Sequence, residues 1–458
     1  MLYRFLQLLV RITIKVFFRK IEVRNKGLIP SAGPLIICAN HPGTFMDPMV
    51  IAAQLNRPVF FLAKGVIFKS KFAQFLLPKL NMIPVYRQQD DPSQLGKNDD
   101  TFVKCHEHLE RGGVILIFPE GISLTERKLK TIKTGAARIA LGAEAKNNFS
   151  LGVKIITIGL NYQNPHKFNQ DLFINIDEPI PLSEFKERYA ADTFKAAHAL
   201  TDRIRGQLEK IIIDIEDENT DELVKKIEEV YKPKLLKEPG VIAEKQHGDF
   251  SITKNIVETV MHFKATDAAR VQRVESKVNR YYTNLMRVGL SDEQLTNKEV
   301  KHSLFLNNVK SISFILVGFP FYIFGLITTF LPFEIPSLLA KRIVSSKEYE
   351  GPVAMAFGII TFSLFYTLET VAIWKYTHDL LLTIFFLFCL PAAGLFAYYY
   401  WHTVDEIRSG WKLINLFYKR SSLIADLILQ RKEIIAEFDN AREEWLRLTS
   451  SPLPVKTT

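Results

Sequence analysis

The chain has 458 residues, is 47% hydrophobic and carries a formal net charge of +10. A positive charge of this size suits an anionic membrane surface or an anionic substrate, and no cluster of basic and aromatic residues resembles a nucleic-acid-binding module, so we expect no nucleic-acid partner. Cys38, Cys105 and Cys389 have neither metal-ligand nor redox spacing, which argues against a disulfide framework and fits a reducing compartment.

The first segment, residues 1–24, is predicted to be an amphipathic helix at a membrane interface. Its basic residues Arg4, Arg11, Lys15 and Arg19 interrupt the apolar run, unlike the core of a signal peptide, and no small-residue cleavage site follows. On a helix they fall within an arc of roughly 80°. This favours a helix that turns its basic side to lipid headgroups, and the alternative is an ordinary amphipathic helix packed on the protein.

Residues 25–215 show short apolar runs that alternate with helical patterns. LIICA (35–39), PVFFLAK (58–64) and VILIF (114–118) are typical of buried strands, and residues 185–218 are predicted to form one long helix. Strands that alternate with helices predict an α/β domain, with a mixed, largely parallel sheet flanked by helices. Ligands of such sheets usually bind beyond the strand ends.

The remainder of the chain is predicted to be helical and partly in a membrane. Residues 216–310 are predicted to be a helical accessory region, and residues 402–458 a basic cytoplasmic tail. Between them, residues 311–401 contain three long uncharged stretches broken only by Glu369, and about 20 apolar residues span a bilayer. Because three full spans would separate the basic tail from the α/β domain, the charge distribution favours a re-entrant or interfacial first stretch and two spans. The α/β domain is then expected on the cytoplasmic face.

The segment NHPGTFMD (40–47) places His41 just after a predicted strand and Asp47 six positions later, before a predicted helix. A histidine oriented by a carboxylate can act as a general base, and no serine is needed if the substrate brings its own hydroxyl. The alternative for this pair alone is a loop histidine beside a helix-capping aspartate.

Three further segments also place polar residues at strand ends. Arg87 ends the third strand of the pattern, IFPEGIS (117–123) places Glu120 and Gly121 in a turn, and TIGLNY (157–162) closes a later strand. In this order and spacing the four segments resemble the phospholipid/glycerol acyltransferase family. The resemblance covers roughly residues 25–215.

The resemblance implies roles for particular residues. His41 would be the general base, and Asp47 would orient it. The phosphorylated glycerol acceptor would be bound by the Arg87 block and by the F-P-E-G block, which contributes Glu120 and Gly121, with Ser123 two positions further on. Other candidates for the acceptor phosphate are the basic residues Lys64 and Lys133, the latter in a set with Arg127, Lys128 and Lys130.

Two departures from the usual family pattern are visible. Five residues separate His41 from Asp47 instead of four, and Ile122 and Ser123 stand where Thr and Arg are usual after F-P-E-G. The longer spacing resembles the branch of glycerol-3-phosphate/dihydroxyacetone-phosphate acyltransferases. The missing Arg implies that phosphate binding depends more on Arg87.

The resemblance implies a membrane-bound O-acyltransferase of phospholipid biosynthesis. It would move a fatty acyl group from acyl-CoA or acyl carrier protein to glycerol-3-phosphate or dihydroxyacetone phosphate, with no metal and no other cofactor. The alternative is a 1-acyl-sn-glycerol-3-phosphate (lysophosphatidate) acyltransferase. A transporter is disfavoured because Glu369 alone interrupts the apolar stretches, and metal-dependent hydrolysis because the chain has no H-E-x-x-H.

Overall fold

The computed structural model describes residues 2–87, 92–238, 248–296, 304–344, 347–419 and 421–450. These residues divide into two compact units. The first comprises Met1–Asp214 and Pro336–Ile359, and the second comprises Ile215–Ile335 and Ile360–Thr458. Each unit is described by itself below.

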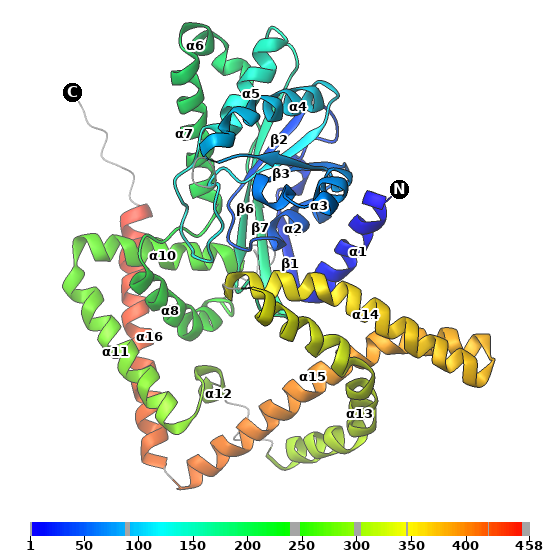
Figure 1. Cartoon of the computed structure of the whole chain (residues 1–458). Coiled ribbons are helices and arrows are strands. Elements are labelled where there is room, and N and C mark those ends of the chain that lie inside the picture. The colour runs from blue at the N-terminus through cyan, green and yellow to red at the C-terminus, as the bar shows by residue number, and fades with distance from the viewer. Residues whose placement is uncertain are drawn as a thin grey trace. The chain divides into compact units, whose positions relative to one another are not determined.

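The first unit is built on a mixed, largely parallel sheet, which confirms the predicted fold class (Figure 1). Its order is β1-β7-β6-β2-β5-β3-β4, and β8 pairs with β6. All neighbours are parallel except β6 with β7 and β6 with β8. The strands are β1 (Phe18–Arg24), β2 (Leu35–Ala39), β3 (Val59–Lys64), β4 (Met82–Val85), β5 (Val114–Ile117), β6 (Lys154–Tyr162), β7 (Gln170–Ile176) and β8 (Ile180–Pro181).

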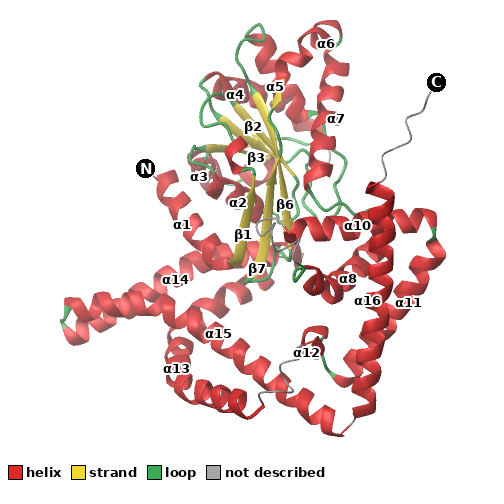
Figure 2. Ribbon diagram, turned by 180° about the vertical axis from the view of Figure 1, so that it is seen from behind, coloured by secondary structure: helices red, strands yellow, loops and turns green. Residues whose placement is uncertain are grey.

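Helices cover both faces of this sheet (Figure 2). They are α1 (Leu2–Phe17), α2 (Met46–Gln54), α3 (Lys71–Leu76), α4 (Asn98–Glu110), α5 (Gly135–Lys146), α6 (Lys186–Ala191) and α7 (Thr193–Ile211). Short 3₁₀ turns lie at Lys26–Leu28, Gly65–Phe68, Leu77–Leu80, Pro92–Lys97 and Leu182–Phe185.

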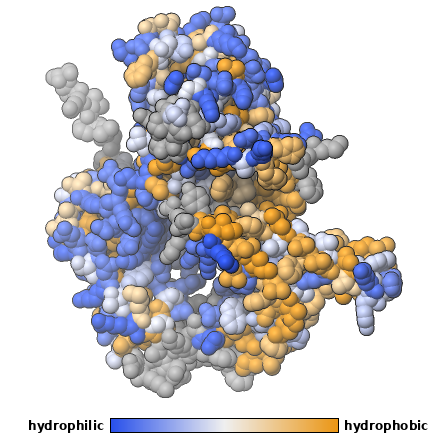
Figure 3. Space-filling model, in the orientation of Figure 1, coloured by the Kyte–Doolittle hydropathy of each residue, from blue (hydrophilic) through white to orange (hydrophobic). Residues whose placement is uncertain are grey.

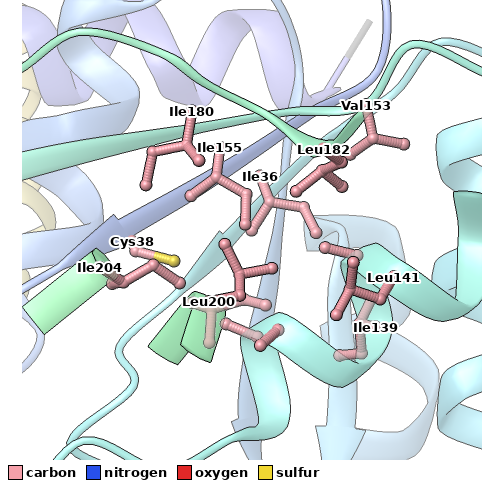
Figure 4. Packing of buried hydrophobic residues seen from close by; sticks show 14 of the residues in the cluster. Ile36, Cys38, Ile139, Leu141, Val153, Ile155, Ile180, Leu182, Leu200 and Ile204 are labelled. Atoms are coloured by element: carbon pink, nitrogen blue, oxygen red, sulfur yellow. The ribbon is translucent and has the colours of Figure 1, made fainter. Parts of the chain in front are cut away.

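The central strand β2 shows why the sheet needs two helical layers. All five of its residues are buried. Successive side chains of a strand point to opposite faces, so Ile36 and Cys38 pack with the residues of α5 and α7 drawn in Figure 4. Leu35, Ile37 and Ala39 pack with α1 and α2 on the other face. An uninterrupted apolar strand is therefore buried on both sides.

The N-terminal prediction of one helix over residues 1–24 is wrong in extent, because α1 ends at Phe17 and the next seven residues form β1. Phe18 is buried in the core. Arg19 therefore lies in the strand, where it donates two hydrogen bonds, of 2.8 and 2.7 Å, to the carboxylate of Asp171 in β7. Arg11 of α1 donates a 3.0 Å hydrogen bond to the Ala53 carbonyl of α2. Arg11 and Arg19, two of the four residues of the predicted basic arc, thus bind other parts of the protein.

The single helix predicted over residues 185–218 is also wrong, because it breaks at Asp192 into α6 and α7. Asp192 has extended backbone angles (φ −159°, ψ 107°). Its side chain accepts hydrogen bonds of 3.0 Å from the amides of Phe194 and Lys195, as a helix N-cap does. The capping bonds start a new helix at Thr193.

The second unit consists of helices among its described residues. Four of them pack together in this unit: α8 (Glu218–Leu235), α10 (Gly248–Thr266), α11 (Ala268–Val288) and α16 (Ser421–Ser450). The short α12 (Asp292–Thr296) is tied to them, because Asp292 accepts hydrogen bonds from Tyr281 of α11 at 2.6 Å and from Arg431 of α16 at 2.7 Å. The predicted accessory region and the end of the predicted tail therefore share one packed core.

The apolar stretches form α13 (Leu304–Ile343), α14 (Lys347–Thr377) and α15 (Leu380–Lys419). In the described part of the chain, three helical stretches are long and apolar enough to cross a membrane, namely Ile312–Ile343, Val353–Thr377 and Leu380–Asp405. Figure 3 shows hydrophobic residues gathered over these helices. The first stretch, which we expected to be re-entrant or interfacial, is helical throughout despite Pro320 and Pro332. Like the other two, it is long and apolar enough to cross a membrane.

Candidate active site

The structure brings His41 and Asp47 together. His41 lies just after β2, and Asp47 lies in the first turn of α2. The imidazole Nδ1 of His41 is 2.8 Å from Oδ2 of Asp47, whose side chain is completely buried while that of His41 is 19% exposed. A tight turn makes this possible, since the amide of Met46 donates a 2.9 Å hydrogen bond to the Gly43 carbonyl and Thr44 adopts a left-handed conformation (φ 50°).

Both carboxylate oxygens of Asp47 accept hydrogen bonds from the surrounding fold. Oδ2 accepts from the Gly43 amide at 2.8 Å as well as from His41, and Oδ1 accepts from the hydroxyl of Tyr162 at 2.7 Å. A Cβ at Gly43 would lie 2.6 Å from Oδ1 of Asp47 and 3.3 Å from the Tyr162 ring, so a side chain there would displace one of them.

Tyr162 is the residue that the sequence analysis missed. It ends β6, and the TIGLNY segment was noted only for polar residues at a strand end. Burial, and then the charge of Asp47, raise the pKa of the Tyr162 hydroxyl well above its ordinary value. The hydroxyl therefore keeps its proton and acts as a donor to the carboxylate.

The hydrogen bond to Asp47 decides which nitrogen of His41 can act as a base. With Nδ1 donating to the carboxylate, Nε2 is the ring nitrogen that accepts a proton. The imidazole is also fixed by stacking on Phe118, with ring centroids 3.9 Å apart and an interplanar angle of 11°. The arrangement can perform general base chemistry at Nε2.

Glu120 and Ser123 hold the backbone of the His41 loop. The carboxylate of Glu120 accepts from the His41 amide at 2.9 Å and from the Lys130 amide at 3.0 Å. The hydroxyl of Ser123 donates to the His41 carbonyl at 2.8 Å and accepts from the Thr44 amide at 3.0 Å. Both side chains are buried, and burial raises the pKa of Glu120 although the two amides oppose that shift.

Cationic side chains gather at the same turn. Gly121 has a positive φ of 68° and its carbonyl accepts a short hydrogen bond from the guanidinium of Arg87. The Lys133 ammonium lies 3.1 Å from the point where a Cβ of Gly121 would be. Lys64 ends β3 in register with Val85 of the parallel strand β4, and Arg87 lies two residues after Val85, so both cationic residues are at one edge of the sheet. Lys130 is ion-paired with Glu126.

The family model named Acyltransferase matches residues 20–161, which include His41, Asp47, Arg87 and the turn at Gly121. The chain contains an acyltransferase-family domain over these residues. The matched residues run from β1 almost to the end of β6, so the acyltransferase domain includes the His41 loop, the Arg87 strand and the F-P-E-G turn. Tyr162 is the first residue beyond the match.

Several curated proteins are similar to this chain. An uncharacterized acyltransferase of Schizosaccharomyces pombe is 22% identical over 65% of this chain and 56% of its own length. Glycerol-3-phosphate O-acyltransferase 2 of Saccharomyces cerevisiae is 22% identical over 63% of this chain and 51% of its own length. The chain thus spans about half the length of these yeast relatives. They fit the predicted branch of the family.

Two bacterial proteins are similar to part of the chain. The 1-acyl-sn-glycerol-3-phosphate acyltransferase of Bacillus subtilis is 27% identical over 40% of this chain and 86% of its own length. The crystal structure of the 1-acyl-sn-glycerophosphate acyltransferase PlsC from Thermotoga maritima matches 47% of this chain and 81% of its own, with 19% identity and a TM-score of 0.33.

Proposed function

We propose that this protein transfers a fatty acyl group from an acyl thioester to a hydroxyl of glycerol-3-phosphate or dihydroxyacetone phosphate. The observation that carries the proposal is the His41–Asp47 pair, 2.8 Å apart, with Nε2 left as the base beside a turn that gathers Arg87 and Lys133. The names of two S. cerevisiae relatives, both glycerol-3-phosphate O-acyltransferases, support the first of these acceptors.

The reaction proceeds by direct attack of the acceptor on the thioester. Nε2 of His41 takes the proton of the acceptor hydroxyl while the oxygen forms a bond to the thioester carbonyl carbon. Asp47, which Tyr162 holds by a hydrogen bond, orients the imidazole and stabilises the imidazolium that forms. Collapse of the tetrahedral intermediate breaks the carbon–sulfur bond, and the imidazolium returns its proton to the departing thiolate of coenzyme A or acyl carrier protein.

The acceptor phosphate is held by cationic side chains at the sheet edge. Arg87 can bind two phosphate oxygens through its planar guanidinium, and Lys133 and Lys64 add charge without fixed geometry. Holding the phosphate places the hydroxyl against Nε2 and removes the entropy cost of bringing the two together. The departure at Ser123, where an arginine is usual, agrees with this reliance on Arg87.

Glu120 and Ser123 have a different role in the proposal from the one that the resemblance implied. The Glu120 carboxylate accepts hydrogen bonds from the backbone amides of His41 and Lys130. The Ser123 hydroxyl donates to one backbone group of the His41 loop and accepts from another. A carboxylate would also repel a phosphate. We therefore assign them as positioning residues, which hold His41 in place through its main chain.

The protein is proposed to work at a membrane, with the acyltransferase domain on the cytoplasmic face. Three apolar helical stretches of the described chain suit integral anchoring. The helix α1 adds an exposed apolar stripe of Leu8, Ile12 and Val16, which are 55%, 53% and 48% exposed. Interface binding by α1 would therefore use this stripe rather than the basic arc expected from the sequence, and the adjacent Lys15 is also exposed.

A lysophosphatidate acceptor is the second candidate, because the B. subtilis relative with this name aligns over 86% of its length. The test is an acyl-transfer assay on the full chain in lipid nanodiscs. Glycerol-3-phosphate, dihydroxyacetone phosphate and lysophosphatidate are supplied separately, each with acyl-CoA or acyl carrier protein as donor.

His41→Ala is the negative control for this assay. We expect it to lower turnover by about 10²–10⁴-fold, the usual contribution of a general base, without loss of folding. Transfer to lysophosphatidate alone would replace the first proposal by the second. Near wild-type turnover of His41→Ala would refute the mechanism for either acceptor.

A further inference from the structure

The second unit contains a cavity that the proposed transfer reaction does not use. It lies between α8, α10, α11 and α16 and has a volume of about 330 Å³. Ligand sites are typically apolar cavities of several hundred Å³. A cavity of this size, lined by four packed helices, is therefore large enough to hold a ligand.

The lining of the cavity is mostly hydrocarbon. Each of the four helices contributes large apolar side chains, among them Ile227, Ile256, Phe263, Val271, Phe438 and Trp445. Most come from positions one or two helical turns apart, so each helix turns an apolar stripe inward. Such a lining binds a ligand by removing the apolar surfaces of both the ligand and the cavity from water.

Polar groups at the wall are largely engaged with protein partners. Arg270 pairs with Glu444 at 2.6 Å and lies 4.6 Å over the Phe263 ring. Arg442 makes two hydrogen bonds of 2.9 Å to Glu238.

Three further lining groups follow the same pattern. Glu437 pairs with Lys277 at 2.7 Å. The hydroxyl of Tyr231 donates to Asp439 at 2.8 Å, and that of Thr259 donates to the Asn255 carbonyl at 2.7 Å. Asn255 and Glu258, which also line the cavity, are exposed to solvent.

Recognition by this wall must therefore come from apolar contact. A sugar, nucleotide or peptide backbone would bury donors and acceptors against hydrocarbon at a cost of about 1–3 kcal/mol for each unpaired group. An unbranched hydrocarbon chain carries no such groups. Its polar end can remain in water beside the exposed Asn255 and Glu258.

We propose that this cavity binds one fatty acyl chain, as a site separate from the His41–Asp47 pair. The choice of hydrocarbon rests on the proposed function, because an acyltransferase works among fatty acids, acyl thioesters and acylated glycerol phosphates. The headgroup does not enter the cavity, so free fatty acid and lysophosphatidate should bind comparably. Glycerol-3-phosphate, which has the headgroup without the chain, should not bind.

The test uses the full chain in nanodiscs and palmitate with a diazirine at mid-chain. After irradiation, the labelled peptides are identified by mass spectrometry. We expect label in peptides of α10, α11 and α16, besides the label that any lipid probe leaves on the apolar stretch 312–405. Excess unlabelled palmitate or lysophosphatidate should remove the label from those three helices, and glycerol-3-phosphate should not.

A filling variant identifies the cavity as the binding site. Val271→Trp places an indole in the space and should lower the labelling of α10 and α16 by about tenfold. Met286→Trp is the matched control, because Met286 lies on the same helix and is 71% exposed. Val260→Phe is a smaller filling change on α10 that should act in the same direction if Val271→Trp fails to fold.

The result is independent of catalysis, because His41→Ala should label as the wild type does. Wild-type labelling of these helices in both filling variants would overturn the proposal, and so would competition by glycerol-3-phosphate. A chain that shows this labelling but no acyl transfer would refute the proposed function and leave a lipid-binding site.

Discussion

The hydrogen bond between Tyr162 and Asp47 should be required for full turnover. Tyr162→Phe removes only the hydroxyl and leaves the ring in its place beside Phe18, whose ring centroid is 5.8 Å away. The hydroxyl donates to Oδ1 of Asp47 at 2.7 Å, while Gly43 and His41 both donate to Oδ2. Without Tyr162, the Oδ1 atom loses the donor that fixes the plane of the carboxylate.

The size of the effect follows from the burial of Asp47, which has no solvent exposure. A hydrogen bond to a charged group contributes about 1.5–3 kcal/mol, and in a buried site water does not readily replace the lost donor. If this energy serves to orient the imidazole, turnover should fall by about ten- to a hundredfold, since each 1.36 kcal/mol corresponds to a factor of ten.

The assay is steady-state acyl transfer by the full chain, with kcat and the KM of each substrate measured separately. We expect Tyr162→Phe to lower kcat and leave the acceptor KM nearly unchanged, because Tyr162 acts through Asp47 and His41. Tyr3→Phe is the matched control: its hydroxyl accepts a 3.1 Å hydrogen bond from the Val59 amide, in the same unit but without contact to Asp47. Wild-type kcat in Tyr162→Phe, or an equal loss of kcat in Tyr3→Phe, would refute the orienting role.

Three further outcomes are expected. Glu120→Gln replaces a carboxylate that accepts hydrogen bonds from two backbone amides by an amide that can accept only one of them. The thermal midpoint and kcat should both fall, kcat by about tenfold, with little change in the KM of the acyl acceptor. A selective rise in that KM would instead indicate that Glu120 binds the acyl acceptor. Arg87→Lys keeps the charge but loses the planar fork, and it should raise the acceptor KM more than the donor KM; equal effects on both would count against phosphate binding. The full chain should stay with membranes after alkaline and high-salt washing, assayed by sedimentation, and release by alkali would contradict integral anchoring through Ile312–Ile343, Val353–Thr377 and Leu380–Asp405.

Contacts between residues close together in the sequence could be predicted for this site, and contacts between distant residues could not. His41 and Asp47 are six residues apart, at the end of a strand and the start of a helix, so the local pattern suggested the pair, and the resemblance to the acyltransferase family favoured it over a loop histidine beside a helix-capping aspartate. Tyr162 is 115 residues from Asp47, and their contact depends on β6 lying next to β2. Strand order cannot be read from apolar periodicity. A tyrosine at the end of a buried strand was the only available signal.

The errors in predicted elements have local causes. The FRKIEVR run of β1 alternates apolar Ile21 and Val23 with charged neighbours, which is a strand pattern, but it was read as a continuation of the preceding helix. The break at Asp192 carries the ordinary signal of a helix N-cap, and only the apolar periodicity on both sides hid it. In both places, a long amphipathic pattern was given more weight than the boundary signal inside it.

The geometry of the candidate site is imposed by three neighbouring strands, β5, β2 and β6, which are parallel and so end at one edge. The amide side chain of Asn40 exchanges hydrogen bonds of 3.0 and 2.7 Å with the backbone of Leu160 and fixes the end of β2 to β6. From the other side, Glu120 after β5 holds the His41 amide. The strands that precede Arg87 and Lys64 lie beyond β5 in the order β6-β2-β5-β3-β4. The base therefore stands in the middle of the edge, and the acceptor phosphate is expected on its β3–β4 side.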